Sequence, residues 1–221
     1  MLDREREQVA AAARRLAAEG LVLGTAGNVS ARTGERVAIT PTGAELAELE
    51  PDQVSVVDLD GNHLAGELEA TSELQLHLGV YGRYEAGAVV HTHAPMATAL
   101  SCVLDEVPCV HYQMLLLGGP IRVAPYFTFG TPELAEAVLD ALEGKTAALM
   151  GNHGAIAYAA DVPAAVQASL LLEWACTVYW RAAALGSPRD LDEGQRAAVV
   201  TAALERGYGA TRRVGEREAE R

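Results

Sequence analysis

The residues AGAVVHTH, at positions 86–93, indicate the centre of the fold. A short run of small and β-branched apolar residues is typical of a strand buried inside a sheet. Side chains two positions apart on a strand point to the same face, so His91 and His93 are expected to project their imidazoles together. The stretch therefore predicts a buried strand that carries two polar side chains at its carboxyl end.

Helices and strands are expected to alternate on both sides of this strand. Apolar residues at helical spacing predict a helix over residues 4–18, and β-branched alternation around Thr33–Gly34–Glu35 predicts a hairpin. The other expected elements are a strand within 53–62, a helix from Thr71 or Ser72 to about Tyr84 with Gln75 in the capping-box position, a helix within 96–104, a strand at 121–124, a helix opened by Thr131–Pro132 and closed by Gly144, strands at 146–150 and 155–158, and helices over about 163–185 and 191–206. This order predicts an α/β fold with three α/β/α layers around a mixed sheet.

The length of 221 residues, half of them apolar, is sufficient for one core. The sequence has no repeat, no low-complexity linker and no domain boundary, so a single domain over 1–221 is expected. Within it, the tail 209–221 is expected to be flexible or dependent on a partner.

The charge balance argues against two classes of partner. Thirty acidic and seventeen basic residues give a formal net charge of −13, which is the wrong sign for nucleic acid or an anionic membrane surface. The charged N-terminus lacks the features of a secretory signal, and the apolar stretch 164–185 is interrupted by Gln167, Glu173 and Arg181. The sequence therefore predicts a cytoplasmic protein with no membrane span.

A third histidine is expected to join His91 and His93 around a metal ion. Catalytic zinc commonly has three protein ligands and leaves a fourth position for water or substrate. His153 is the candidate, because Gly151 and Gly154 allow a tight turn that presents its ring. The alternative is that the two histidines of the strand are ordinary surface or core residues.

Glu73 is the candidate for proton transfer beside this metal. It falls in the first turn of its expected helix, where a carboxylate is also favoured for purely structural reasons. His77, one helical turn later, either orients Glu73 or is a core histidine whose hydrogen bonds are satisfied.

Three short segments rich in hydroxyls, amides and glycine could bind an anion without any lysine. They are Gly24–Asn28, Thr40–Gly43 and Thr71–Ser72. Glycine allows close approach of the backbone, and the helix that follows Ser72 offers N–H donors. Each segment is also an ordinary turn or cap. The segment GTAGN lacks the glycine spacing of a dinucleotide site.

Taken in order, these motifs resemble one family. GTAGNVS, ITPTG, TSE, VVHTHAP, the step His111–Tyr112, APYFTFGT and GNHG have the order and spacing of the class II aldolase/adducin family. The likeness runs from about residue 5 to residue 208, and among the members it is greatest to those that cleave L-fuculose 1-phosphate. The resemblance implies a mixed, largely antiparallel sheet and a cyclic homotetramer with active sites between neighbouring subunits.

The resemblance also implies an activity in carbohydrate metabolism. A zinc-dependent lyase would reversibly cleave a ketose 1-phosphate, such as L-fuculose 1-phosphate, to dihydroxyacetone phosphate and a small aldehyde such as L-lactaldehyde. One Zn²⁺ per subunit would be bound by His91, His93 and His153, with Glu73 as fourth ligand and proton carrier. Another divalent metal is an alternative, since imidazole also binds cobalt, manganese and iron.

Roles for the remaining site residues follow from the same resemblance. The substrate phosphate would be surrounded by Asn28, Thr42, Gly43, Thr71 and Ser72. Thr71 stands where serine is frequent in the family, which keeps the hydroxyl. Tyr112 would be the acid/base at the aldehyde oxygen, and Tyr208 would approach a neighbouring subunit's site.

Related activities remain as alternatives. A methylthioribulose-1-phosphate dehydratase, a sugar-acid phosphate decarboxylase or a pentulose-phosphate 4-epimerase shares the metal site and phosphate loops. The 4-epimerases tend to have aspartate at the position of Glu73, which argues against that activity. A non-catalytic, adducin-like binding module would keep the fold and lose the metal ligands.

Overall fold

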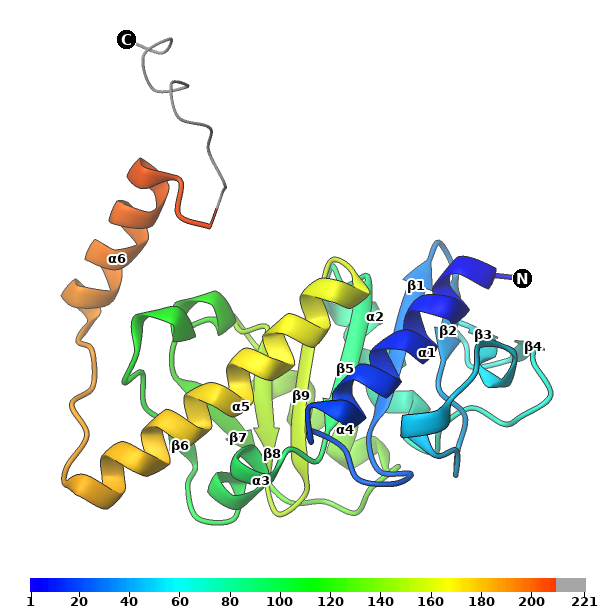
Figure 1. Ribbon diagram of the computed structural model, residues 1–221, viewed down its shortest axis with the longest axis horizontal. Helices are drawn as coiled ribbons and strands as arrows, with labels where there is room; N and C mark the ends of the chain where they lie inside the picture. The colour runs from blue at the N-terminus through cyan, green and yellow to red at the C-terminus, as the bar shows by residue number, and fades with distance from the viewer. Residues whose placement is uncertain (210–221) are drawn as a thin grey trace, which may run out of the picture. The chain divides into compact units, whose positions relative to one another are not determined.

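The protein, seen here in a computed structural model, is described over residues 1–209. Nine strands within this range form one sheet, in the order β4-β3-β2-β1-β5-β9-β8-β7-β6 (Figure 1). Their bounds are β1 Asn28–Thr33, β2 Arg36–Ile39, β3 Ser55–Asp58, β4 His63–Ala65, β5 Ala88–Thr92, β6 Glu106–Val107, β7 Ile121–Ala124, β8 Ala147–Met150 and β9 Gly154–Ala159. Neighbouring strands run antiparallel except β7 and β8, which are parallel. The predicted α/β fold with a mixed, largely antiparallel sheet is confirmed.

The strand predicted from residues 86–93 lies in the middle of this sheet. All five residues of β5 are buried, and the strand pairs with β1 on one side and β9 on the other. Its register with β1 sets Asn28 opposite His91. Two segments that are more than sixty positions apart in the sequence are thereby held side by side.

Helices cover both faces of the sheet. Five α-helices belong to residues 1–190, which form one compact unit: α1 Asp3–Ala18, α2 Leu74–Arg83, α3 Pro95–Ser101, α4 Pro132–Ala141 and α5 Val162–Leu185. Helices α1 and α5 contact each other and pack on one face, while α2 and α4 pack together on the other (Figure 1). The three predicted layers are therefore present.

The core between the sheet and α2 determines which way His91 faces. Val89 and Ile156 of the sheet pack there with Leu76 and Val80 of α2. Because alternate residues of a strand share a face, His91 points to the same side as Val89, toward α2. This orientation directs its ring to the layer that carries Glu73.

The start of α2 differs from the prediction. The helix begins at Leu74 with Glu73 as its N-cap residue, and neither Thr71 nor Ser72 caps it together with Gln75. The Thr71 hydroxyl oxygen instead accepts hydrogen bonds from the Glu73 N–H and from the side-chain amide of Asn28 on β1. Glu73 consequently lies before the first helical turn, not in it.

Other bounds agree with the sequence more closely. Helix α4 begins at Pro132 after the Thr131 cap, as predicted, and ends at Ala141 rather than at Gly144. Three short 3₁₀ helices, η1 Leu46–Glu48, η2 Pro51–Gln53 and η3 Tyr112–Leu117, and the short strands β4 and β6 were not anticipated.

The second unit, from residue 191 onward, carries α6 Glu193–Arg206. Asp192 caps this helix, and a capping box joins it to Gln195. Of the tail predicted to be flexible or partner-dependent, residues 210–221 lie outside the described residues. The prediction of one domain over 1–221 stays a prediction.

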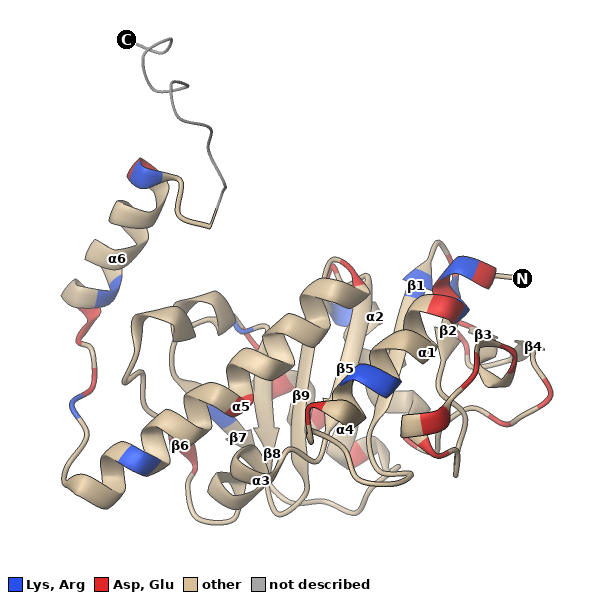
Figure 2. Cartoon of the chain, in the orientation of Figure 1, with Lys and Arg blue, Asp and Glu red and all other residues tan. Residues whose placement is uncertain are grey.

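The charge of the chain and the hydropathy of its helices concern the prediction that neither nucleic acid nor a membrane is a partner. Acidic and basic residues are spread over many elements (Figure 2), and the whole chain has a net charge of −13. Within residues 1–209, none of the helices combines the length and apolar character that a membrane crossing requires.

Candidate metal centre and active site

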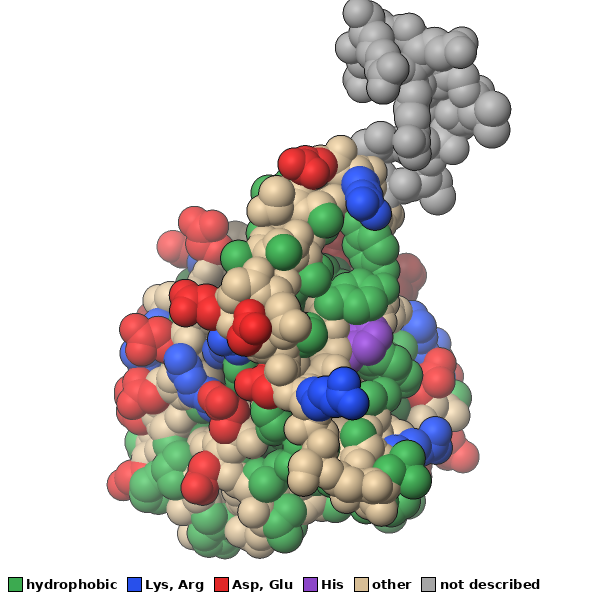
Figure 3. Space-filling model, turned by 90° about the vertical axis from the view of Figure 1, so that its left-hand side faces the viewer, with side chains coloured by type: hydrophobic (Ala, Val, Ile, Leu, Met, Phe, Trp, Pro, Cys, Tyr) green, Lys and Arg blue, Asp and Glu red, His purple; other side chains and the backbone are tan. Residues whose placement is uncertain are grey.

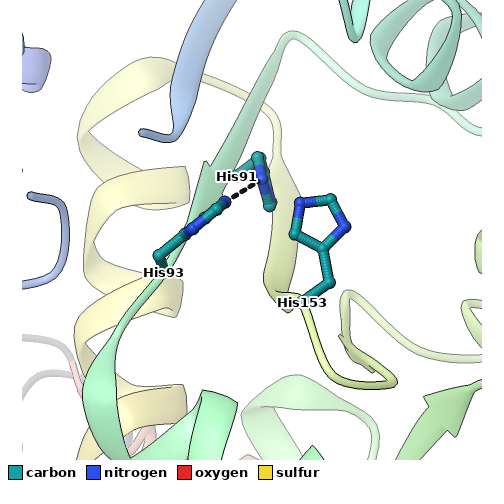
Figure 4. Close-up of side chains that lie close together, drawn as sticks. All are labelled: His91, His93 and His153. Atoms are coloured by element: carbon teal, nitrogen blue, oxygen red, sulfur yellow. Dashed lines mark hydrogen bonds between the residues drawn. The ribbon is translucent and has the colours of Figure 1, made fainter. Parts of the chain in front are cut away.

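Three histidines converge beside the carboxyl end of β5. His91 and His93 come from this strand and the residue after it, and His153 comes from the turn that joins β8 to β9 (Figure 4). Their ring centroids are 4.9, 4.9 and 5.0 Å apart, and one nitrogen of each lies within 4.8 Å of the others. A single ion between these nitrogens could be bound by all three.

Backbone geometry explains how His153 reaches this position. Asn152 has a φ of 53°, a left-handed conformation that asparagine tolerates better than most residues. A Cβ at Gly154 would lie 2.3 Å from the Thr92 carbonyl oxygen, so the chain can approach β5 here only as glycine. The turn that the sequence indicated depends on both residues.

Second partners fix the orientation of the ligand rings. The Nδ1 of His91 lies 2.9 Å from the Ala155 carbonyl oxygen, which can only accept, so this nitrogen carries the hydrogen. Its Nε2 then faces the centre, 3.1 Å from the Nε2 of His93. Burial lowers the pKa of His93 and of His153 to about 4, so both rings are neutral near pH 7, as metal ligands must be.

Glu73 completes the donor set. Its Oε2 lies 3.2 Å from the Nε2 of His91, and its Oε1 lies 3.5 Å from the Nε2 of His153. Burial acts to raise the pKa of Glu73, but its interactions with His91 and His153 and a hydrogen bond from Asn28 hold the pKa well below its ordinary value. The buried Oε1 has no hydrogen-bond partner among the described residues. Three imidazoles and a buried carboxylate oxygen without a partner fit a divalent cation.

A pocket of about 460 Å³ opens beside this cluster, a suitable size for a small substrate. Glu73, His93 and His153 line this pocket. It is also lined by every residue expected around the phosphate, namely Asn28, Thr42, Gly43, Thr71 and Ser72. The three short segments singled out in the sequence therefore meet at one cavity next to the metal centre.

The two tyrosines of the expected site are not brought into this pocket. Tyr112 begins η3, is 40% exposed and is not among the residues that line the cavity. Tyr208 follows α6 in the second unit and is also exposed. Neither tyrosine is therefore among the residues that line the pocket of this chain.

Sequence reasoning missed part of the pocket wall. Tyr126, Phe127 and Phe129 line the cavity, as does Asn152. The three aromatic residues lie within the motif APYFTFGT, and their signal was a cluster of aromatics in a loop between a strand and a helix, where no core position requires them.

Comparisons with known proteins agree with this geometry. The family profile described as Class II Aldolase and Adducin N-terminal domain matches residues 7–180. The chain is 36% identical to 5-deoxy-D-ribulose 1-phosphate aldolase of Bacillus thuringiensis serovar kurstaki, over 88% of this chain and 93% of the relative. It is 39% identical to 5-methylthioribulose-1-phosphate/5-deoxyribulose-1-phosphate aldolase of Rhodospirillum rubrum, over 84% and 85%. A solved L-fuculose 1-phosphate aldolase superposes with a TM-score of 0.87 at 31% identity, over 91% of this chain and 96% of that one.

The chain belongs to the class II aldolase and adducin family. Within it the protein is an enzyme, a metal-dependent aldolase, and the alternative of a non-catalytic binding module is wrong. The predicted likeness to L-fuculose-1-phosphate aldolase is confirmed, and the aldolases named for 5-deoxyribulose 1-phosphate are similar to a comparable degree.

Proposed function

We propose that the protein is a zinc-dependent lyase that reversibly cleaves a ketose 1-phosphate, L-fuculose 1-phosphate or a close analogue, to dihydroxyacetone phosphate and a small aldehyde. The observation that carries the proposal is the shared pocket, in which a three-histidine cluster and Glu73 adjoin three hydroxyl- and glycine-rich segments. The relatives named above act on sugar 1-phosphates, which supports the substrate class.

Thr71 illustrates how an anion is held without a lysine. Its Oγ1 accepts from the Asn28 Nδ2 at 3.2 Å and from the Glu73 N–H at 3.3 Å. Because both neighbours donate to this oxygen, the hydroxyl hydrogen is left to donate to a ligand in the pocket. A phosphate oxygen is the acceptor that we assign to it, with Asn28, Thr42, Gly43 and Ser72 around the same group.

The reaction needs a group that stabilises negative charge on the substrate and two groups that transfer protons. Zn²⁺ bound by the three histidines would supply Lewis-acid stabilisation of the negative charge that develops on the substrate oxygens. In the condensing direction, the Glu73 carboxylate takes a proton from the carbon of dihydroxyacetone phosphate that forms the new bond, and the Tyr112 phenol gives its proton to the aldehyde oxygen as the carbon–carbon bond forms. Cleavage is the reverse of these two transfers, and exchange with solvent returns both groups to their starting states.

Tyr112 would act from a neighbouring subunit of a homotetramer, with Tyr208 also approaching a neighbour's site. Tyr112 lies 4.5 Å from His111 between ring centroids, and His111 lies 4.8 Å from Trp174 of α5. Leu116, Trp174 and Trp180 are 64, 41 and 50% exposed. Figure 3 shows one face of the molecule, on which hydrophobic side chains are exposed among polar and charged ones. Apolar surface around Tyr112 supports contact with another copy.

The test of activity incubates zinc-loaded protein with L-fuculose 1-phosphate, 5-deoxy-D-ribulose 1-phosphate and methylthioribulose 1-phosphate, and follows dihydroxyacetone phosphate. Formation of this product from any one of them supports the aldolase reaction, and the relative kcat/KM values identify the substrate. Consumption without dihydroxyacetone phosphate would show another reaction, such as dehydration, instead. Glu67→Gln, an exposed carboxylate outside the pocket, is the matched control for Glu73→Gln.

The test of the shared site mixes two inactive proteins. Tyr112→Phe and Glu73→Gln chains, carrying different affinity tags, are expressed together and hybrid oligomers are purified. If Tyr112 serves a neighbour, some sites combine an intact Glu73 with an intact Tyr112, and activity returns. If Tyr112 serves its own chain, no site is complete and the hybrids stay inactive.

Localisation in the cytoplasm is part of the proposal. Cell fractionation with an antibody to the chain tests it.

A further inference from the structure

A second polar cluster, formed by His77, Ser30 and Tyr81, adjoins Asn28 of the active-site pocket. The reaction described above does not use this cluster. His77 of α2 is fully buried, and each of its ring nitrogens has one partner. Its Nε2 lies 2.5 Å from the Asn28 Oδ1, and its Nδ1 lies 2.7 Å from the Ser30 hydroxyl. The Ser30 hydroxyl is in turn 2.7 Å from the hydroxyl of Tyr81, which is also buried.

This cluster is joined to the active site through one side chain. The Asn28 Nδ2 lies 2.9 Å from the Glu73 Oε2 and 3.2 Å from the Thr71 Oγ1. Asn28 therefore touches the proton carrier and the anion pocket at one end of its amide, and His77 at the other. Its backbone is fixed by the pairing of β1 with β5, opposite His91.

The ionised state of Glu73 sets the direction of each hydrogen bond in the series from Glu73 through Asn28, His77 and Ser30 to Tyr81. An ionised carboxylate only accepts, so the Asn28 group beside it is the NH₂ and the group beside His77 is the carbonyl. A carbonyl oxygen only accepts as well, so the His77 Nε2 carries a hydrogen and donates it. Burial lowers the pKa of His77 to about 3, so the ring is neutral and Nδ1 accepts from Ser30. Ser30 has one hydrogen, and Tyr81 therefore donates to Ser30.

We propose that His77 is a positioning residue, which holds the Asn28 amide with its NH₂ toward Glu73 and Thr71. The inference rests on the proposed function, in which Glu73 moves a proton. Without the His77 donor, the two orientations of the amide differ less in energy. The reversed amide sets a carbonyl oxygen against the Glu73 carboxylate, which moves the carboxylate or displaces Asn28 from the pocket.

A role in packing alone does not account for this arrangement. A buried imidazole costs free energy unless its nitrogens are paired, and an apolar side chain would fill the same space between α2 and β1 without that cost. His77 instead presents a donor to the one polar side chain that reaches Glu73. The orientation of Asn28, rather than the volume of the ring, is what His77 contributes.

The first experiment is a double-mutant cycle on zinc-loaded protein, with kcat and KM measured for the best ketose 1-phosphate. His77→Leu is expected to lower kcat about 10–100-fold, as loss of a partner that orients a site residue typically does. His77→Gln, which offers one donor and one acceptor, is expected to recover most of that loss. Zinc content stays at the wild-type level in both variants because His77 is not a ligand.

The cycle is closed in an Asn28→Ala background. If His77 acts through Asn28, adding His77→Leu changes kcat less than about twofold further, since the shared partner is already absent. An equal fold-loss with and without Asn28 overturns the proposal. Tyr84→Phe is the control, because it removes a hydrogen bond to Leu139 from the residue that follows the same helix, without a path to Glu73. It is expected to leave kcat unchanged.

The second experiment does not depend on activity. Nitrogen-15 NMR of histidine-labelled protein, with His77→Gln used for assignment, reports which ring nitrogen of His77 carries its hydrogen. The proposal requires a hydrogen on Nε2 and none on Nδ1 at neutral pH, in the metal-free protein as well. A hydrogen on Nδ1 alone would contradict the proposed direction of the hydrogen bonds from His77 to Asn28 and from Ser30 to His77. Absence of lyase activity with the required tautomer present would contradict the proposed function and leave the orientation of Asn28 standing.

Discussion

Two groups of polar side chains, one around His77 and one around His91, His93 and His153, differ in how their polar atoms are paired. Around His77 every ring nitrogen and hydroxyl has a partner of the opposite kind. Around His91, His93 and His153, ring nitrogens face one another and the carboxylate, and the buried Glu73 Oε1 has no hydrogen-bond partner among the described residues. The first group needs nothing more from outside, whereas the second needs a cation. Pairing, rather than burial or residue type, separates a structural histidine from a ligand.

The largest expected effect comes from removing one member of the second group. His93→Ala should lose the metal and nearly all activity, because two imidazoles and a carboxylate no longer enclose the ion. The fold should remain, since His93 lies beyond the end of β5 and is not a core residue. Metal analysis and circular dichroism check both points. Full metal occupancy in this variant would contradict the difference between the two groups.

Glu73→Gln should reduce kcat by about 10²–10⁴-fold, the usual contribution of a general acid or base. The neutral amide keeps an oxygen for Asn28 to donate to, so the pocket should hold substrate with a KM within a few-fold of wild type. Steady-state kinetics on metal-loaded protein, with metal content measured in parallel, separates loss of proton transfer from loss of the ion. Unchanged kcat would remove Glu73 from the reaction.

Tyr112→Phe should slow turnover by about 10²-fold or more while the metal content stays normal, because Tyr112 is outside the cluster and handles only a proton. Metal analysis and kcat measured on the same preparation test this. Turnover equal to wild type would mean that water or another group accepts the aldehyde proton.

Stability of metal-free protein should fall as the pH decreases from about 7 toward 4. The folded pKa is about 4 for His93 and His153 and about 3 for His77, all below the ordinary value of 6.5. Between these values the unfolded chain binds protons that the folded chain does not, so lower pH favours unfolding. Thermal unfolding after chelation, at several pH values, measures the slope. His77→Gln should reduce the slope, whereas a pH-independent midpoint would contradict the neutral, buried state of these rings.

The smallest effect is expected from Tyr84→Phe, which belongs to neither group. Loss of its hydrogen bond to the Leu139 carbonyl should cost about 0.5–1.5 kcal/mol of stability with no change in metal content. Denaturant unfolding gives the free energy. A change in metal content would mean that α2 transmits disturbances to the metal centre without the Asn28 link.

Local patterns were enough to predict the central strand and the two histidines that it presents. The alternation of His91 and His93 follows from strand geometry, and the glycines around His153 indicated a turn. The candidate anion-binding segments were predicted from short motifs, and the structure gathers them because β1, the residues after β2 and the start of α2 meet at one pocket.

What the sequence did not indicate depends on contacts between distant segments. Spacing along α2 suggested that His77 might touch Glu73, but the register of β1 with β5 inserts Asn28 between them. The helix start was misjudged for the same reason, because the Thr71 hydroxyl is engaged by Asn28 from another strand. Under the proposed function Tyr112 acts from a neighbouring copy, and the sequence of one chain has no local pattern that would indicate such a contact.

The pairing of Asn28 with His91 has a consequence for substrate selection. Opposite residues of antiparallel strands lie about 4.5–5.5 Å apart, and hydrogen bonds of the sheet fix that spacing. Under the proposed roles, one strand bears a phosphate contact and the next bears a metal ligand. The sheet would then fix the distance between the group that binds the phosphate and the group that binds the metal, and so the length of the reacting fragment that fits. Sugars phosphorylated one carbon further from the carbonyl would be rejected by length, without any side chain dedicated to excluding them.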